Sequence, residues 1–260
     1  MRILVTGGRT GYLGRHVVAA AAGHDVVAVG SVDADVRDPS AVEALVDHCR
    51  PDVVVHTAYV QSDSEVTGPG SAHVARAASR AGARLVLVSS DIVFSGSEKP
   101  YDESAVPDPV SAYGEAKVLA ENAALDSGAD AVVARTSLLM GDGRSVHEAM
   151  FRALARGADG VLFEDERRCP VHVADLAAAL VELAGNDVRG VLHLGGADPM
   201  SRLDLGRLVA RRDGLDPGAL RAGRRADLAD PGPIDVRLDS SLASRLLTTR
   251  LRGAREFLAR

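Results

Sequence analysis

The chain has 260 residues, of which 46% are hydrophobic and 25% charged, and its formal net charge is −6. This composition is typical of a globular protein, and its acidic balance argues against binding to nucleic acid or to an anionic membrane. No apolar run reaches the roughly 18 residues of a membrane-spanning helix, and Cys49 and Cys169 have neither CxxC nor metal spacing, so we expect no metal site and a cytoplasmic location.

Strand-like and helix-like segments alternate along the chain. Apolar, β-favouring runs predict strands at residues 2–6, 25–29, 52–57, 84–89, 131–135, 160–163 and 191–194. Helical patterns lie at 13–22, 39–49, 70–81, 111–127, 145–156, 173–184 and 203–212, with a weaker one at 250–259. This alternation predicts βαβ units and a parallel sheet that binds ligands at the carboxyl ends of its strands. Residues 214–233, rich in Gly, Pro, Arg and Asp, are expected to form a loop.

The first predicted strand leads into a glycine-rich turn and then into a helix, which is the order that a dinucleotide-binding loop requires. We expect Gly8 to allow a tight turn, Gly11 to let the backbone approach a pyrophosphate, and Gly14 to let helix and strand pack closely. The phosphates would lie at the helix N-terminus, where N–H groups and the helix dipole attract anions. The candidate cofactor-binding residues here are Gly8, Arg9, Thr10, Gly11, Tyr12, Leu13 and Gly14; a flexible hairpin turn is the alternative.

The end of the second predicted strand bears on the choice between NAD and NADP. A chain that prefers NAD carries an acidic residue roughly 20 positions past the glycines. That position falls at Gly30-Ser31, and Asp33 follows slightly later. Arg9 is well placed for a 2′-phosphate, so NADP(H) is favoured over NAD(H), with Asp33 as the residue that would favour a free ribose.

Two lysines, Lys99 and Lys117, are found among 30 basic residues. Lys117 follows Tyr113 by four residues within the predicted helix 111–127, so the two side chains share one helix face. An ammonium beside a phenol favours the phenolate and lowers a pKa that is about 10 when unperturbed. The pair therefore indicates a general acid or base; an ordinary amphipathic helix with a surface lysine is the alternative.

Several segments occur in a characteristic order. Ser89-Ser90-Asp91-Ile92-Val93-Phe94-Ser95-Gly96 is similar to Ser-Thr-Asp-Tyr-Val-Phe-Asp-Gly, and it is followed by Pro100-Tyr101-Asp102-Glu103, Tyr113-Gly114-Glu115-Ala116-Lys117, Arg135-Thr136-Ser137, Asp165 to Pro170, Asp175-Leu176-Ala177 and Leu238-Asp239-Ser240-Ser241. With the glycine loop, these segments resemble the extended short-chain dehydrogenase/reductases, and most closely the dTDP-4-dehydrorhamnose reductase family. The resemblance covers nearly the whole chain.

The resemblance implies an α/β fold, a Rossmann-type doubly wound parallel sheet with a small interleaved C-terminal substrate lobe. Residues 1–136 would form the dinucleotide-binding core, and residues 137–260 the remaining core elements interleaved with the lobe. Asp35 and Val36 resemble the acid–aliphatic pair that holds adenine. Thr57, Ala58 and Tyr59 correspond to the segment that lines the nicotinamide ribose. Relatives often dimerise, so a homodimer is expected.

The resemblance also implies an NADPH-dependent reductase that transfers hydride to the carbonyl of a keto-sugar nucleotide or a related small keto compound. Tyr113 would donate a proton as general acid, Lys117 would lower its pKa and hold the ribose, and Ser90 would stabilise the developing alkoxide. Asp91, Ile92 and Arg168 are candidate substrate-binding residues.

Three positions depart from the family pattern. Thr67 stands where relatives often have asparagine, and Ile92 replaces a tyrosine. Arg168 occupies a position that is usually glycine. Arg168 is either a ligand for a carboxylate or phosphate or a solvated loop charge. Two other functions stay open: a non-catalytic NADP-binding regulator resembling the regulatory subunit of methionine adenosyltransferase, and a tailoring ketoreductase or epimerase of a secondary pathway with a non-sugar substrate.

Overall fold

The structure is a computed structural model that describes residues 1–230 and 232–259. Residue 231, which falls inside the predicted loop 214–233, and residue 260 lie outside the described residues. Across the described chain, no helix combines the length and the apolar character needed to cross a bilayer.

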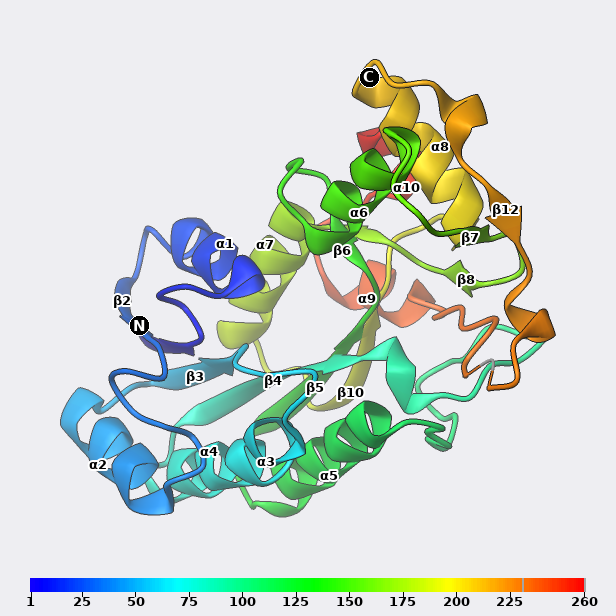
Figure 1. Ribbon diagram of the computed structural model, residues 1–260. Helices are drawn as coiled ribbons and strands as arrows, with labels where there is room; N and C mark the ends of the chain where they lie inside the picture. Colours follow the sequence, from blue (N-terminus) through cyan, green and yellow to red (C-terminus); the bar gives the residue numbers. More distant parts are fainter. Residues whose placement is uncertain (231, 260) are drawn as a thin grey trace.

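Six parallel strands of the described chain form one central sheet in the order β10-β5-β4-β3-β1-β2 (Figure 1). They are Arg2–Thr6 (β1), Asp25–Val29 (β2), Val53–His56 (β3), Arg84–Ser90 (β4), Ala131–Thr136 (β5) and Gly190–Leu194 (β10). β1 pairs with β2 on one side and with β3 on the other, so the strand order reverses between β1 and β3. Ligands of such sheets bind outside the carboxyl ends of the strands at this reversal. The predicted doubly wound parallel sheet is confirmed.

Helices cover both faces of the sheet (Figure 1). Tyr12–Ala20 (α1) and Val173–Ala184 (α7) pack on one face, where Ile3 and Val5 of β1 join their core. On the other face, Leu4 packs in a second core with Pro39–Cys49 (α2), Pro69–Arg80 (α4) and Ala112–Asp126 (α5). Alternate residues of each strand thus face opposite layers, which is why these strands are mainly apolar.

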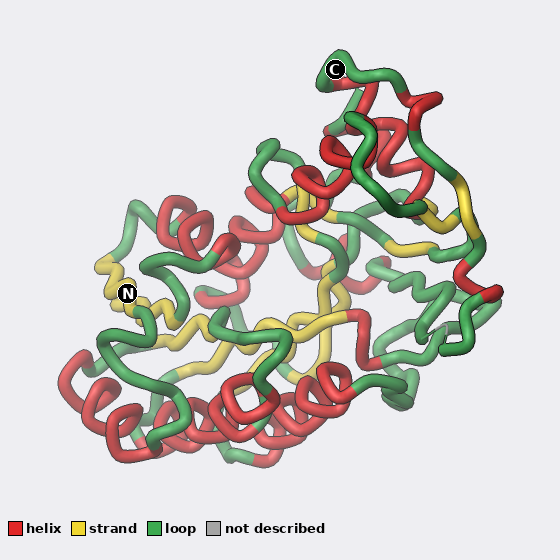
Figure 2. Tube along the Cα trace, in the orientation of Figure 1, coloured by secondary structure: helices red, strands yellow, loops and turns green. Residues whose placement is uncertain are grey.

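A smaller group of elements lies beyond the carboxyl ends of the strands (Figure 2). Val146–Ala155 (α6), Arg202–Arg212 (α8) and Ala254–Phe257 (α10) share an apolar core that includes Phe151 and Leu205. Two-residue strands pair beside them: Leu139–Met140 (β6) with Val171–His172 (β9), Leu162–Phe163 (β7) with Ala222–Gly223 (β12), and Arg167–Arg168 (β8) with Met200–Ser201 (β11). We call this group the small lobe.

Most predicted elements agree with the structure to within one or two residues, and the larger differences in length lie in the small lobe. The strand predicted at 160–163 is only β7, and the helix predicted at 250–259 is only the four-residue α10. The predicted loop 214–233 contains β12 and two 3-10 turns, Pro217–Ala219 (η2) and Arg225–Asp227 (η3). Short elements without a periodic sequence pattern were not predicted; they include Ser64–Thr67 (α3), Asp91–Val93 (η1) and Ser241–Leu246 (α9).

A buried ion pair connects α5 to the centre of the sheet. Arg135 of β5 donates from Nη2 to Oε2 of Glu121 at 2.7 Å, and both side chains are at most 4% exposed. Ser89 of β4 donates to the other oxygen of Glu121 at 2.5 Å. The Arg135 guanidinium also lies 5.1 Å from the ring centroid of Phe94. These contacts fix α5 against β4 and β5 at one register.

We predict that Arg135→Ala lowers the free energy of unfolding by about 3–5 kcal/mol, because it leaves the Glu121 carboxylate buried without its counter-ion. Urea unfolding followed by circular dichroism measures the loss. Arg250→Ala is the control: it removes an ion pair to Glu256 whose side chains are 74% and 44% exposed, and should change stability by less than about 1 kcal/mol. Equal losses in the two variants would contradict the assigned role.

Candidate active site

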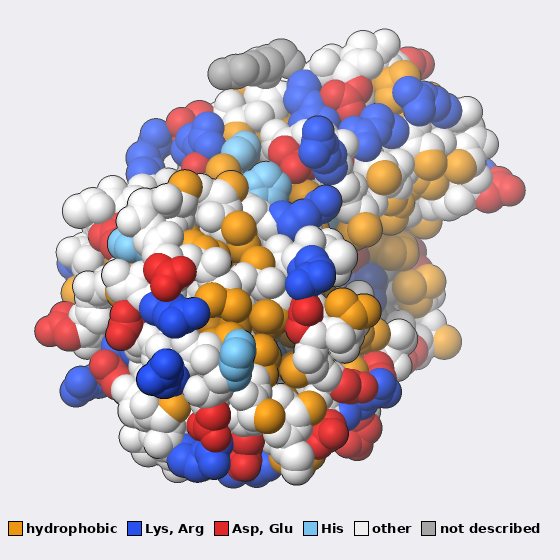
Figure 3. Space-filling model, turned by 90° about the vertical axis from the view of Figure 1, so that its left-hand side faces the viewer, with side chains coloured by type: hydrophobic (Ala, Val, Ile, Leu, Met, Phe, Trp, Pro, Cys, Tyr) orange, Lys and Arg blue, Asp and Glu red, His pale blue; other side chains and the backbone are white. Residues whose placement is uncertain are grey.

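A cleft of about 940 Å³ opens at the carboxyl ends of β1, β3 and β4, between the sheet and the small lobe. Its lining includes an apolar section at the ends of β1 and β2, formed by Leu4, Val29, Val36, Val42, Val46 and Val74. Figure 3 shows hydrophobic side chains gathered on the face of the molecule that lies at the left of Figure 1, with basic and acidic side chains around them. The cleft therefore begins at the strand-order reversal, where a dinucleotide binds in folds of this type.

The glycine loop forms one wall of the cleft. Gly7 has a φ of +72°, and the N–H of Gly11 donates to its carbonyl at 3.0 Å. Gly8 closes the tight turn, because its N–H donates to the Val5 carbonyl at 3.2 Å, and a Cβ on Gly8 would lie 2.8 Å from that oxygen. Gly7 supplies the positive φ within the same turn. A Cβ on Gly14 would lie 2.2 Å from the Gly7 carbonyl oxygen. Only glycine permits this close contact between turn and helix.

The N-terminus of α1 fits an anionic group. Its N-cap is Gly11, and among the described residues no side chain caps it. The loop residues Thr10, Gly11, Tyr12, Leu13 and Gly14 line the cleft. N–H groups of a first helical turn that lack a side-chain acceptor attract phosphate, which the helix dipole reinforces. This wall fits the pyrophosphate of a dinucleotide.

The predicted adenine segment lies in the apolar section of the cleft. Val36 and Asp35 both line it. Arg37, which the sequence analysis missed, donates from Nη2 to Asp35 at 2.6 Å and lines the cleft beside it. The hydrogen bonds from Arg37 hold the pKa of the Asp35 carboxyl at about 2. Arg9 is 55% exposed and donates to Asp33 at 2.9 Å, so the two residues that were expected to favour NADP and NAD form one ion pair.

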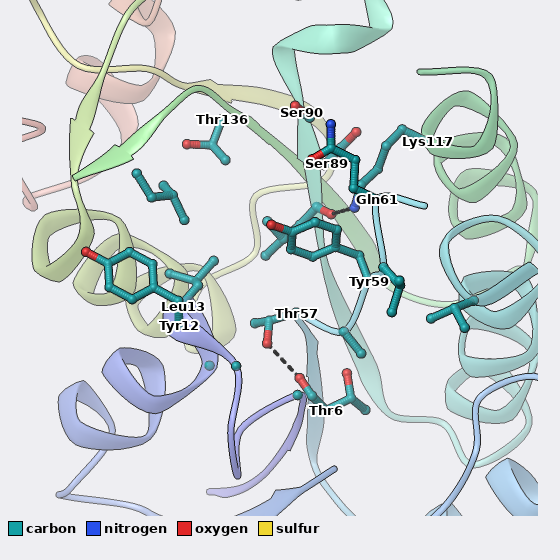
Figure 4. Close-up of a pocket in the computed structure, with 18 of the residues that line it drawn as sticks. Thr6, Tyr12, Leu13, Thr57, Tyr59, Gln61, Ser89, Ser90, Lys117 and Thr136 are labelled. Atoms are coloured by element: carbon teal, nitrogen blue, oxygen red, sulfur yellow. Dashed lines mark hydrogen bonds between the residues drawn. The ribbon is translucent and has the colours of Figure 1, made fainter. Parts of the chain in front are cut away.

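The predicted catalytic residues line the cleft from β4 and α5; Figure 4 shows two of them, Ser90 and Lys117. Ser90 is the last residue of β4, and its neighbours Asp91 and Ile92 lie in η1. Lys117 is only 4% exposed and donates to the carbonyl of Val88 at 2.9 Å. The residues Ser90, Asp91, Ile92, Tyr113 and Lys117 all line the cleft.

Tyr59 lies next to the tyrosine–lysine pair. The Lys117 ammonium is 5.2 Å from the ring centroid of Tyr59 and 5.9 Å from that of Tyr113, and the two ring centroids are 5.9 Å apart. Figure 4 shows Tyr59 and Lys117 on the same side of the pocket, with Tyr12 and Leu13 of the glycine loop across from them. Thr57 and Ala58, at the end of β3, also line the cleft. Sequence positions far apart in the chain therefore meet at one cavity.

Burial dominates the electrostatics of this pair. The pKa of the Tyr113 phenol lies above its ordinary value because burial, and then Tyr59 and Asp91, disfavour the phenolate, whereas a hydrogen bond with Ser90 opposes this change. Burial lowers the pKa of Lys117 to about 8, against the charge of Glu121. Burial thus disfavours both charged forms, and the ammonium is directed at the Val88 carbonyl. That Lys117 lowers the pKa of Tyr113 stays a prediction.

The positions that depart from the family pattern have defined surroundings. The Thr67 hydroxyl donates to the Val60 carbonyl at 2.9 Å and accepts from its N–H at 3.2 Å, so it holds the backbone after Tyr59. Arg168 is only 3% exposed, so it is not a solvated loop charge. It donates to the carbonyl of Pro233 at 3.1 Å, and its Nε lies 3.7 Å from Asp91.

A group of arginines forms the small-lobe wall of the cleft around one buried carboxylate. Glu166 is 3% exposed and accepts from Arg202 at 2.9 Å and from Arg225 at 3.0 Å, and Nη2 of Arg168 lies 3.7 Å from it. His147 lies 3.4 Å from Arg202, and burial lowers the pKa of its imidazole to about 4. All five residues line the cleft. The sequence analysis missed this group, apart from Arg168, because its members come from four separate segments with no common motif.

Comparison with known proteins is consistent with this geometry. A family model described as the RmlD substrate binding domain matches residues 1–260. A dTDP-4-dehydrorhamnose reductase of Mycobacterium tuberculosis is 36% identical, over 89% of this chain and 82% of that protein. The methionine adenosyltransferase 2 subunit beta of Xenopus tropicalis is 30% identical, over 78% and 67%. The crystal structure of the Bacillus anthracis dTDP-4-dehydrorhamnose reductase in complex with NADP has a TM-score of 0.88 at 22% identity, covering 99% of this chain and 95% of that one.

We predict that the stability difference between Lys117→Met and the native protein depends on pH. Burial lowers the pKa of Lys117 from 10.5 to about 8, so between these pH values the folded protein binds fewer protons than the unfolded chain. The cost of burying the ammonium is fully present below pH 8 and is lost as the pH rises to 10.5. The relative advantage of the methionine variant should therefore fall by roughly 3 kcal/mol across this window.

Urea unfolding at a series of pH values measures this difference. Lys99→Met, which changes the chain's only other lysine at an exposed position, is the control and should show a constant difference. A Lys117→Met difference that stays constant across the window would mean that Lys117 does not titrate there.

Proposed function

This chain belongs to the RmlD substrate binding domain family, and from this premise we propose that it is an NAD(P)-dependent oxidoreductase that reduces the carbonyl of a keto-sugar nucleotide. One observation carries the proposal: Ser90, Tyr113 and Lys117 line the same cleft as the glycine loop. The similarity to a dTDP-4-dehydrorhamnose reductase supports the reductase class and the sugar-nucleotide substrate.

In this proposal each residue of the site has a separate role in the reduction of a carbonyl. When bound, a nicotinamide supplies the hydride. Tyr113 donates the proton to the carbonyl oxygen, and its raised pKa keeps it protonated at neutral pH. The Ser90 hydroxyl donates to the same oxygen as charge develops there. The Lys117 ammonium stabilises the phenolate that remains on Tyr113, and it binds the nicotinamide ribose.

The two walls of the cleft suit different ligands: the core wall suits the cofactor and the small-lobe wall the substrate. Residues Gly11–Gly14 and Thr57–Tyr59 would hold the pyrophosphate and the nicotinamide ribose, and Asp35 and Val36 the adenosine. The small lobe, within residues 137–260, would be the substrate lobe. Three guanidinium groups on one buried carboxylate give its wall a net positive charge, which suits the diphosphate of a sugar nucleotide. Ile92 and Asp91 would border the sugar.

Arg9 is the basis for proposing NADP(H) over NAD(H). Its side chain lies next to the end of β2, where its Cβ is 3.5 Å from a Cβ built on Gly30, and Gly30 and Ser31 line the cleft. A 2′-phosphate there would compete with Asp33 for the guanidinium, since Asp33 already pairs with Arg9 and accepts from the Gly30 N–H at 2.8 Å. We therefore expect the preference for NADP(H) over NAD(H) to depend on whether a 2′-phosphate displaces Asp33 from Arg9.

A non-catalytic NADP-binding regulator is the second candidate function. The similarity to a methionine adenosyltransferase 2 subunit beta favours it. Both candidates bind the same cofactor class, so turnover and partner binding separate them. A tailoring ketoreductase or epimerase with a non-sugar substrate is a variant of the first candidate that Ile92 and Arg168 favour, because both depart from the family pattern.

We predict that Tyr113→Phe lowers kcat by at least about 100-fold with a panel of keto-sugar nucleotides and small ketones, because it removes the proton donor. NADPH oxidation measures turnover, and NADPH fluorescence measures binding, which should change little. Tyr101→Phe, a tyrosine outside the cleft, should keep the native kcat. If the native protein binds NADPH, oxidises none with any ketone and co-purifies with an enzyme, the regulator is the correct function.

We predict opposite effects of Arg9→Ala and Asp33→Asn on cofactor choice. Arg9→Ala should weaken NADPH binding about tenfold more than NADH binding, because it removes a charge-assisted contact to the 2′-phosphate. Asp33→Asn should strengthen NADPH binding, because it removes the competing carboxylate. Titration with each cofactor measures both ratios, and equal changes for NADPH and NADH would contradict the assignment of Arg9.

A further inference from the structure

Tyr12 of the glycine loop makes a contact that cofactor binding does not explain. Its hydroxyl donates to Oδ1 of Asp142 at 2.6 Å, and Nε2 of His16 lies 3.1 Å from Oδ2 of the same carboxylate. The rings of Tyr12 and His16 meet edge to face, with centroids 5.5 Å apart. Burial and Asp142 raise the pKa of the Tyr12 phenol, so it stays protonated as the donor. We call Tyr12, His16 and Asp142 the clasp.

The clasp joins the two walls of the cleft. Tyr12 and His16 belong to α1 of the core, whereas Asp142 lies between β6 and α6, at the entry to the small lobe. The residues that follow Asp142 line the same cleft as the glycine loop; they are Arg144, Ser145, Val146 and His147. A residue at the N-terminus of α1 is thus bonded to the segment that leads into α6 of the small lobe.

The segment that follows Asp142 is bonded to α6 of the small lobe. Gly141 and Gly143 have φ values of +116° and +78°, so the backbone changes direction on both sides of Asp142. Beyond it, the carbonyl of Gly143 accepts from Arg152 of α6 at 2.7 Å, and its N–H donates to Glu148 at 3.2 Å. Residues 143–145 are therefore tied to α6, and the clasp is what ties them to α1.

We propose that the clasp closes the cleft over the bound dinucleotide and controls its release. This inference rests on the proposed function, because it needs a cofactor at the N-terminus of α1. Asp142 is a positioning residue: it acts through Tyr12 and through the segment that leads into α6. A ligand held between the two walls leaves only after the Tyr12–Asp142 hydrogen bond breaks.

The test is the dissociation rate of NADPH from the purified full chain, measured by displacement with excess NADP⁺. The chain has no tryptophan, so the fluorescence of NADPH itself is the signal. Asp142→Ala and Tyr12→Phe break the clasp from its two sides, and each should raise the dissociation rate about tenfold, which corresponds to about 1.4 kcal/mol. The double variant should be no faster than Asp142→Ala alone, because both changes remove one interaction.

Asp159→Ala is the matched control. Its carboxylate pairs with Arg221 on the exterior of the small lobe at 3.2 Å, and the dissociation rate should equal that of the native protein. Circular dichroism establishes that each variant folds, and Tyr12→Phe keeps the ring contacts should Asp142→Ala fail to fold. Native dissociation rates in both variants would overturn the inference while leaving the proposed function intact. A native protein that binds neither NADPH nor NADH would overturn the proposed function and the clasp together.

Discussion

The register of α5 against β4 is the constraint on which the candidate site depends. Ser90 ends the strand, whereas Tyr113 and Lys117 lie on the helix, so the three groups meet only if helix and strand keep one offset. Glu121 fixes that offset, because it accepts hydrogen bonds from Ser89 of β4 and from Arg135 of β5. A buried ion pair adds little net stability compared with apolar side chains. Its contribution here is geometric, since it allows few alternative positions of the helix.

The two walls of the cleft offer a ligand different kinds of interaction. The core wall offers backbone N–H groups at α1 and an apolar section, and this arrangement needs no charged side chain. The small-lobe wall concentrates arginines on Glu166. Arg168 also reaches Asp91, whose pKa is raised by burial and lowered again by this guanidinium. A substrate at the second wall would therefore exchange one ion pair for another, and Arg168 serves first to compensate two buried carboxylates.

The sequence predicted the parts of the fold that rest on periodicity and the parts of the site that rest on local motifs. Apolar runs predicted every strand of the central sheet, because the inner strands are buried on both faces and the edge strand β2 keeps a run of valine and alanine. The two-residue strands of the small lobe have no such pattern, since tertiary contacts alone determine their pairing. Gly7 and Gly8 both belong to the tight turn, but only Gly7 has a positive φ of +72°, a difference that the sequence does not show. The contacts of Arg168, Glu166 and Asp142 join segments far apart in the chain, so no local pattern predicts them.

If Tyr113 is the general acid proposed above, burial keeps its phenol in the protonated form that a carbonyl reduction requires at neutral pH. Oxidation of an alcohol needs a phenolate on Tyr113, and burial makes that anion costly. Reduction of a carbonyl needs a protonated phenol at the start. The phenolate forms, and needs stabilisation, only after the proton has left. Lys117, with a pKa of about 8, is mostly protonated at pH 7 and can supply that stabilisation late in the reaction. The same burial thus raises the pKa of Tyr113 and lowers that of Lys117, so the proposed proton donor and the cation that would stabilise its phenolate are both present at pH 7.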